Sequence, residues 1–121
     1  MLPWHTDSMV EVVGTDEFEA WYGGLNEKEM DEVDHLVGLL EQQGVTLRFP
    51  YSSALAGTKS ALRELRGTAG KAELRIVYAF DPRRNAVLII GGDKSGDKRF
   101  YERILAQAEA IWAQYLSEQG F

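Results

Sequence analysis

Apolar residues recur in the first third of the chain with the spacing of two amphipathic helices. The first predicted helix begins after Thr15-Asp16, which offers N-caps, and ends at Gly23-Gly24 because glycine disfavours helix. The second begins at Asn26, with Glu29 in the capping-box position, and ends at Gly44. The two stripes consist of Phe18, Trp21, Tyr22 and Leu25, and of Met30, Val33, Leu36, Val37, Leu39 and Leu40. We expect an acidic antiparallel helical hairpin whose aromatic residues pack in a core.

Alternation typical of β-strands dominates the middle of the chain. In residues 72–80, Leu74, Ile76 and Tyr78 share one face, while Arg75 and Val77 share the other. The other predicted elements are strands at 9–13, 62–66 and 86–90, a loop at 46–61, a glycine-rich turn at 91–97, and a closing helix with an apolar stripe from Tyr101 to Tyr115. Because short links join the consecutive strands between 62 and 90, we expect an antiparallel meander.

This order of strand, helix, helix, three strands and helix is typical of an α+β fold. We expect a small, mostly antiparallel sheet with an N-terminal helical hairpin and a C-terminal helix, the helices covering one face. A length of 121 residues suits one compact domain. We therefore expect a flexible tail at residues 1–8 and a single domain at residues 9–121.

Composition removes several functional classes. The chain has no cysteine, which excludes thiolate nucleophiles and cysteine-ligated zinc. Its two histidines, His5 and His35, are too far apart for a recognisable ligand spacing, so we expect neither a metal nor another cofactor. No apolar run is long enough to span a bilayer, and the N-terminus lacks the basic and apolar regions of a secretory signal. We expect a cytoplasmic protein without a membrane partner.

Charge is unevenly distributed along the chain. The net charge is −6, but residues 1–46 contain 11 acidic residues and one basic residue, Lys28. Residues 47–121 contain 12 basic and 8 acidic residues, a net charge of +4. The C-terminal part can therefore form a local basic site within an acidic protein.

The most distinctive chemistry is a basic cluster. The glycine-rich turn does not match the P-loop pattern, and no histidine is placed to activate a nucleophile, so catalysis would use Arg, Lys, Tyr or carboxylates. Arg66 and Arg75 lie on adjacent predicted strands that a short turn separates, so they can share one sheet face. Lys94 follows the next strand, so its amine can reach the same place. Such a cluster suits phosphate recognition.

The alternative is that the arginines form ordinary cross-strand ion pairs, Glu64 with Arg75 or Glu73 with Arg66, and that Tyr101 belongs to the core.

Several segments together resemble a known family. In order they are Pro50–Leu55, Leu62–Arg66 containing ELR, Leu74–Phe80 containing RxxYxF with Arg75, Val87–Lys94 ending in GGDK, and Phe100–Arg103. The series is similar to the HigB-like, phage-derived branch of the RelE/ParE toxin superfamily. The resemblance extends over roughly residues 9–116 and implies a RelE-like fold.

The resemblance implies the toxin of a type II toxin–antitoxin pair, cleaving mRNA on the ribosome without metal by attack of a 2′-OH on the adjacent phosphate. By motif position, Arg66 and Arg75 would hold the phosphate, and Lys94 would add charge or transfer a proton. Tyr101 would stack on a base or carry a proton. The residues expected to contact the RNA backbone are Lys59, Arg63, Lys98 and Arg99.

The resemblance leaves two other functions open. ParE-like members inhibit gyrase and cleave nothing, and a third alternative is an inactive interaction protein with the toxin fold. The resemblance also implies a cognate helix-turn-helix antitoxin, HigA-like, as a protein partner. Of the three functions, only the first implies mRNA on the ribosome as a substrate.

Overall fold

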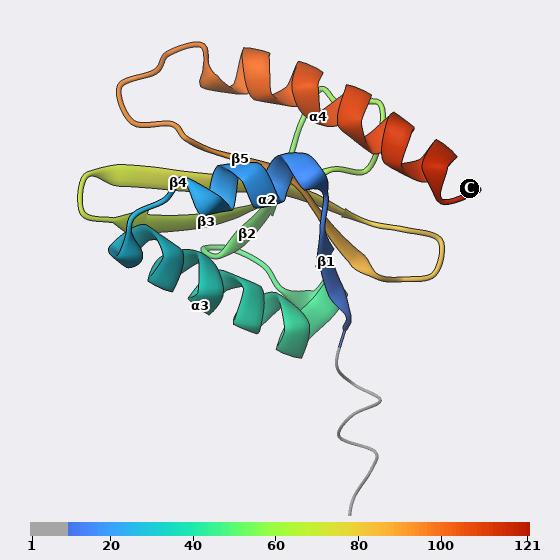
Figure 1. Ribbon diagram of the computed structural model, residues 1–121, viewed down its shortest axis with the longest axis horizontal. Helices are drawn as coiled ribbons and strands as arrows, with labels where there is room; N and C mark the ends of the chain where they lie inside the picture. Colours follow the sequence, from blue (N-terminus) through green and yellow to red (C-terminus); the bar gives the residue numbers. More distant parts are fainter. Residues whose placement is uncertain (1–9) are drawn as a thin grey trace, which may run out of the picture.

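A five-stranded sheet forms the middle layer of the protein in the computed structural model, which describes residues 10–121 (Figure 1). The elements are β1 (Val12–Gly14), α2 (Asp16–Gly23), α3 (Glu27–Gln43), a 3₁₀ turn (Gly44–Thr46), β2 (Ser52–Ala54), β3 (Arg63–Ala69), β4 (Ala72–Phe80), β5 (Ala86–Asp93) and α4 (Phe100–Glu118). The strand order is β1-β5-β4-β3-β2. β1 runs parallel to β5, and every other pair is antiparallel. The predicted α+β class with a mostly antiparallel sheet is confirmed. The tail expected at residues 1–8 lies outside the described residues, as does Met9.

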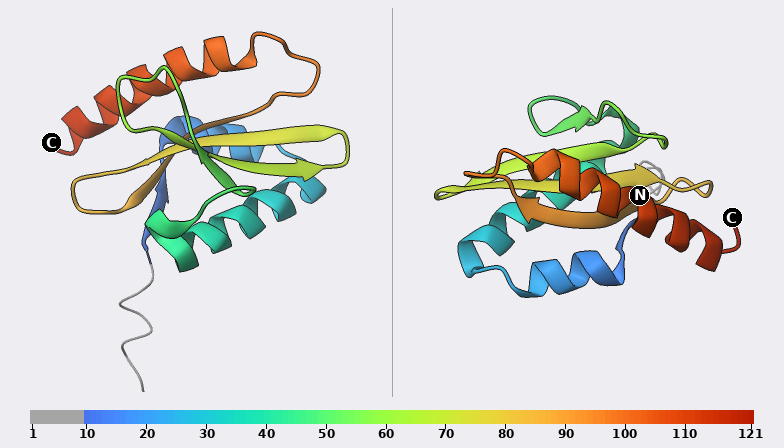
Figure 2. Two further views of the ribbon diagram at one scale, coloured as in Figure 1. Left: turned by 180° about the vertical axis from the view of Figure 1, so that it is seen from behind. Right: turned by 90° about the horizontal axis from the view of Figure 1, so that it is seen from above.

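Helices cover both faces of this sheet, so the expectation that they share one face was wrong. α3 lies on one side and α4 on the other (Figure 1; Figure 2, left panel). On β4, Leu74 and Ile76 join the core beneath α2 and α3, whereas Val77 and Ala79 join the core beneath α4. The alternation predicted for β4 is correct, but its second face is apolar over half its length. That face requires a helix to cover it.

Several element boundaries differ from the sequence-based expectation. The predicted loop at 46–61 contains the edge strand β2, paired with β3. β3 does not end at Gly67 but continues to Ala69, because Gly67 lies where Glu32 and Leu36 of α3 approach the backbone and a side chain would collide with them. β1 lies at Val12–Gly14 rather than 9–13.

Both helix starts are capped as expected, with Thr15 rather than Asp16 capping α2 and Asn26 forming a capping box with Glu29 on α3.

The glycines of the GGDK segment belong to β5 rather than to the expected turn at 91–97. β5 continues through Gly91 and Gly92 to Asp93. A Cβ at Gly91 would overlap the Trp21 indole of α2, and one at Gly92 would lie 2.7 Å from a carbon of the Phe100 ring in α4. Because neither glycine has a side chain, an aromatic ring packs against the strand at each of them, Trp21 at Gly91 on one face of the sheet and Phe100 at Gly92 on the other. The loop between β5 and α4 is correspondingly short.

The Gly91→Ala variant is expected to lower the free energy of unfolding by about 1–3 kcal/mol, because the added methyl group overpacks the contact with Trp21. Urea unfolding of the purified protein measures this change. Gly38→Ala is the matched control, since an added Cβ there meets no atom within 4 Å and alanine favours helix. Equal stability of the Gly91→Ala variant and the wild type would contradict the packing role of Gly91.

Candidate functional site

The two arginines singled out in the sequence are direct cross-strand neighbours. Arg66 of β3 pairs in register with Arg75 of β4, so both side chains leave the sheet on the face that α4 covers. Like charges opposite each other are unfavourable unless nearby anions compensate them. The register confirms the prediction that Arg66 and Arg75 share a sheet face. The acidic groups around the two arginines are therefore important for compensating their charges.

Arg75 is part of a buried network with Glu64 and Tyr101. Arg75 is 6% exposed and Glu64 is 4% exposed. The Tyr101 hydroxyl donates to Glu64 Oε1 at 2.7 Å and accepts from Arg75 Nε at 3.3 Å. Arg75 Nε also lies 3.8 Å from Glu64 Oε1. The ion pair that the sequence offered as an alternative thus exists, but it is buried rather than solvated, and it includes the tyrosine.

Glu64 is the functional candidate that sequence reasoning considered only as half of an ion pair. Its second carboxylate oxygen accepts from the Ser53 hydroxyl at 3.3 Å. Because β2 was predicted to be loop, nothing in the sequence placed Ser53 beside β3. Alternation along β3 puts Glu64 on the same face as Arg66, which was a usable signal. Its burial depends on α4 and could not be seen in the pattern.

Tyr101 is held as a protonated phenol. Burial first, and then the hydrogen bond to Glu64, raise the pKa of its hydroxyl above the ordinary value, while the hydrogen bond from Arg75 acts in the opposite direction. A raised pKa makes Tyr101 a proton or hydrogen-bond donor at neutral pH rather than a phenolate base.

Lys94 reaches the same cluster through Glu73. Glu73 Oε1 lies 3.8 Å from Arg75 Nη2 and 3.7 Å from Lys94 Nζ, and its side chain is 45% exposed. The Lys94 amide also donates to the Glu73 carbonyl at 2.9 Å, which extends the pairing of β4 and β5 beyond Asp93. Of the two carboxylates at Arg75, Glu64 is enclosed and Glu73 is accessible to solvent.

Arg66 faces a pocket of about 330 Å³ that Arg75 also lines. Tyr51, Pro50 and Glu32 lie around the same pocket. The guanidinium carbon of Arg66 lies 5.2 Å from the centre of the Phe49 ring, a cation–π arrangement. A phosphate in this pocket would reach both arginines.

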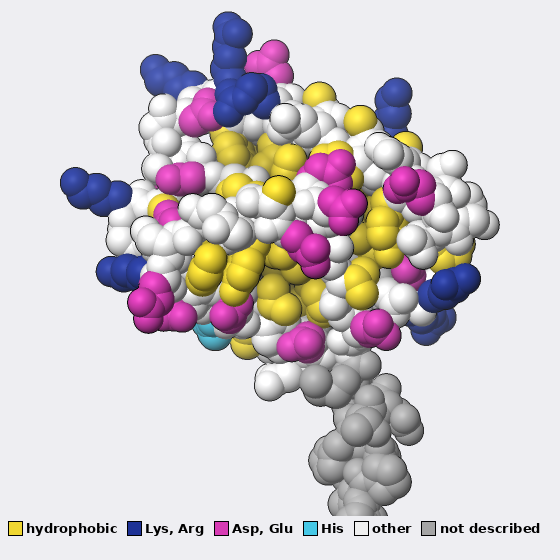
Figure 3. All heavy atoms as spheres, viewed as in Figure 1, with side chains coloured by type: hydrophobic (Ala, Val, Ile, Leu, Met, Phe, Trp, Pro, Cys, Tyr) yellow, Lys and Arg dark blue, Asp and Glu magenta, His cyan; other side chains and the backbone are white. Residues whose placement is uncertain are grey.

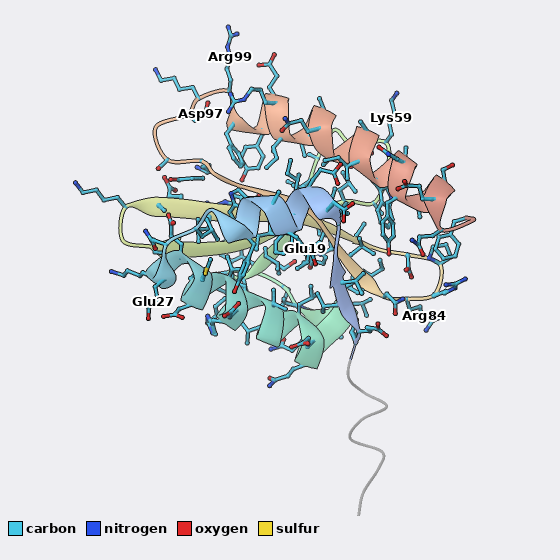
Figure 4. All side chains as sticks on the ribbon, in the orientation of Figure 1. Glu19, Glu27, Lys59, Arg84, Asp97 and Arg99 are labelled. Atoms are coloured by element: carbon cyan, nitrogen blue, oxygen red, sulfur yellow. The ribbon has the colours of Figure 1, made fainter. Side chains whose placement is uncertain are left out.

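The four cations expected to contact RNA backbone are dispersed. Arg63 lies on the opposite face of β3, where its Nε donates to Ser52 Oγ at 3.1 Å and to the Tyr78 hydroxyl at 3.3 Å. The Lys59 amide donates to Glu109, which fixes the β2–β3 loop against α4. Lys98 and Arg99 are exposed just before α4. Lys59 and Arg99 point outward at separate places along α4 (Figure 4).

Many acidic side chains lie on the surface of α2 and α3 (Figure 3). Asp and Glu side chains spread over the face formed by α2 and α3, while Lys and Arg side chains lie toward the rim (Figure 3). Exposed members of this acidic face include Glu17, Glu19, Glu27, Asp31 and Asp34. The uneven charge along the sequence is thus also uneven in space.

Within residues 10–121, the arrangement of acidic and histidine side chains bears on metal binding, and the length and polarity of the helices bear on membranes. No group of three or more His, Asp or Glu side chains in this part of the chain is arranged to hold a metal ion. Within the same residues, no helix is sufficiently long and apolar to span a bilayer.

Chemically, the cluster combines groups suited to a phosphate ester. Arg66 and Arg75 offer planar hydrogen-bond donors, Lys94 offers an ammonium group, Tyr101 offers a proton, and Glu73 offers an accessible carboxylate. Such groups can neutralise charge and move protons without a metal.

Comparisons with known proteins identify relatives in Mycobacterium tuberculosis (strain ATCC 25618 / H37Rv). The protein named "Putative toxin HigB2" is 30% identical over 115 residues, covering 93% of this chain but 57% of the relative, so the chain spans little more than half its length. The protein named "Putative toxin HigB3" is 39% identical over 105 residues, covering 84% of this chain and 90% of the relative. The family model for phage-derived Gp49-like proteins (DUF891) matches residues 20–113, which include the whole cluster from Glu64 to Tyr101. The chain therefore belongs to the phage-derived Gp49-like family.

Proposed function

We propose that this protein is the toxin of a type II toxin–antitoxin pair and that it cleaves mRNA on the ribosome without a metal. The observation that carries the proposal is the cross-strand pair Arg66–Arg75, which lines one pocket. Arg75 is also hydrogen-bonded to Tyr101 and connected through Glu73 to Lys94. The relatives named as HigB toxins support the toxin role. The partner would be a helix-turn-helix, HigA-like antitoxin, and the compartment would be the cytoplasm, where mRNA is translated.

The proposed reaction is an internal transesterification. The ribose 2′-oxygen forms a bond to the adjacent phosphorus as the P–O5′ bond breaks, leaving a 2′,3′-cyclic phosphate and a free 5′-OH. Arg66 and Arg75 hold the non-bridging oxygens, and Lys94 neutralises the charge that grows on the phosphorane. No water or redox partner is consumed.

Two proton transfers accompany this step. Tyr101 gives its proton to the departing 5′-oxygen, turning its hydroxyl from Glu64 toward the substrate while Arg75 continues to compensate Glu64. Glu73 accepts the proton of the 2′-OH, because it is the carboxylate of this cluster that is both accessible and adjacent to Arg75 and Lys94. Solvent returns both groups to their starting states.

The test is induced expression of the chain without its neighbouring gene, followed by mapping of new 5′ ends on translated mRNA. Growth arrest with cuts at in-frame codon positions is the expected result. Arrest without cuts would contradict RNA cleavage and favour a target such as gyrase, as in ParE-like proteins. Absence of arrest would contradict the toxin role and leave an interaction protein.

A further inference from the structure

Two of the largest exposed apolar side chains lie in one short segment. Phe49 is 69% exposed and Tyr51 is 41% exposed, and both belong to the segment that leads into β2. Isolated exposed aromatic residues are common, but two rings within three residues form a small apolar surface with flat faces. The proposed catalytic chemistry uses neither ring.

The backbone and two neighbouring side chains position this segment. The Arg66 amide donates to the Tyr51 carbonyl at 2.8 Å, continuing the β2–β3 pairing. The His35 ring of α3 lies edge-on to the Tyr51 ring, and the ring centres are 6.1 Å apart. On the other side, the Arg66 guanidinium carbon lies 5.2 Å from the Phe49 ring centre. The aromatic segment is therefore attached to β3, the strand that carries the phosphate-binding candidate Arg66.

The pocket joins the aromatic segment to the basic cluster. Tyr51, Arg66 and Arg75 all line it, and Glu32 lies on its α3 side. A carboxylate there repels a phosphate, so the anionic part of a ligand would lie toward the arginines and its neutral part toward the rings. A nucleotide has this division between an anionic phosphate and a flat, neutral base.

We propose that Phe49 and Arg66, supported by Tyr51, form a stacking site for an unpaired nucleobase of single-stranded RNA beside the phosphate held by Arg66 and Arg75. Aromatic rings and guanidinium planes are the surfaces on which single-stranded bases stack. This inference rests on the proposed function, whose substrate it specifies as an unstacked strand. It also gives Arg66 two roles, since its guanidinium group contacts the phosphate and lies over the Phe49 ring.

The test is binding of a short single-stranded RNA that carries one 2-aminopurine and 2′-O-methyl groups throughout, so that it cannot be cleaved by 2′-OH attack. Stacking quenches 2-aminopurine fluorescence. The wild-type protein is expected to bind and quench, and Phe49→Ala is expected to weaken binding about 5- to 150-fold, the effect usual for losing one stacked base. Phe49→Trp should retain binding and quenching because it preserves a flat ring.

Phe121 provides a matched control. It is an exposed phenylalanine, 42% exposed, and the Arg83 guanidinium carbon lies 5.1 Å from its ring centre. Phe121→Ala therefore removes the same kind of cation–π contact at the C-terminus and should bind RNA as the wild type does. Circular dichroism verifies that each variant is folded, and the exposure of Phe49 makes a folded alanine variant the expected outcome.

Cleavage of translated mRNA, measured on the same proteins, separates this inference from the proposed function. If the wild type cleaves and Phe49→Ala binds and cleaves equally well, the stacking site is wrong and the nuclease function stands. If the wild type quenches the probe in a Phe49-dependent manner but cleaves nothing, the site stands and the nuclease function fails. Absence of both binding and cleavage overturns both.

Discussion

Replacing Arg75 by alanine is expected to abolish growth arrest and mRNA cleavage and to lower the free energy of unfolding by about 3–5 kcal/mol. Both effects come from its position. Arg75 is the guanidinium group that contacts Tyr101 and lies between Glu64 and Glu73. Without it, Glu64 loses the one cation that lies within 4 Å of its buried carboxylate among residues 10–121. Urea unfolding measures the stability, and 5′-end mapping of translated mRNA measures the cleavage.

Because this variant is less stable, loss of activity alone would be ambiguous. The double variant Arg75→Met with Glu64→Gln resolves this, since it removes both buried charges and keeps similar volumes. Replacing a buried ion pair by neutral groups is often close to neutral in stability. We expect the double variant to recover most of the lost free energy of unfolding and to remain inactive. Recovery of cleavage together with stability would show that Arg75 has only a structural role.

The elements that the sequence predicted best are those whose pattern is decided locally. The strand at 72–80 has the predicted bounds, and its residues alternate between the two faces of the sheet as expected. The helix from Asn26 to Gly44 is confirmed together with its capping box, because Asn26 and Glu29 interact within one turn. Chain order and short links were then sufficient to predict the antiparallel meander.

The errors occurred where distant contacts decide the structure. Gly67 and Gly91 are strong turn signals, yet both lie within strands, because α3 and Trp21 approach the sheet at these points. β2 has only three residues, and its pairing partner lies beyond a loop. By contrast, the adjacency of the two predicted strands correctly indicated that Arg66 and Arg75 share a face of the sheet. The burial of Glu64 could not be predicted, since it depends on the position of α4.

The Tyr101→Phe variant tests proton transfer by Tyr101 while it leaves the architecture of the site in place. It removes one oxygen and keeps the ring, so the contact of Tyr101 with Phe100 is preserved. Glu64 loses its 2.7 Å hydrogen bond but retains Ser53 and Arg75 nearby. We expect the free energy of unfolding to fall by about 1–3 kcal/mol, the effect usual for a lost hydrogen bond to a charged group.

Cleavage should fall much further, by about 10²- to 10⁴-fold in kcat, which is the usual contribution of a general acid. The KM for programmed ribosomes should change little, because Arg66 and Arg75 remain to bind the phosphate. Tyr115→Phe is the matched control, since Tyr115 lies on the same helix and stacks on Trp112. Its activity should equal that of the wild type. A Tyr101→Phe protein with wild-type kcat would show that the leaving oxygen takes its proton from another group, and Tyr101 would then serve only to hold Glu64 and Arg75 in place.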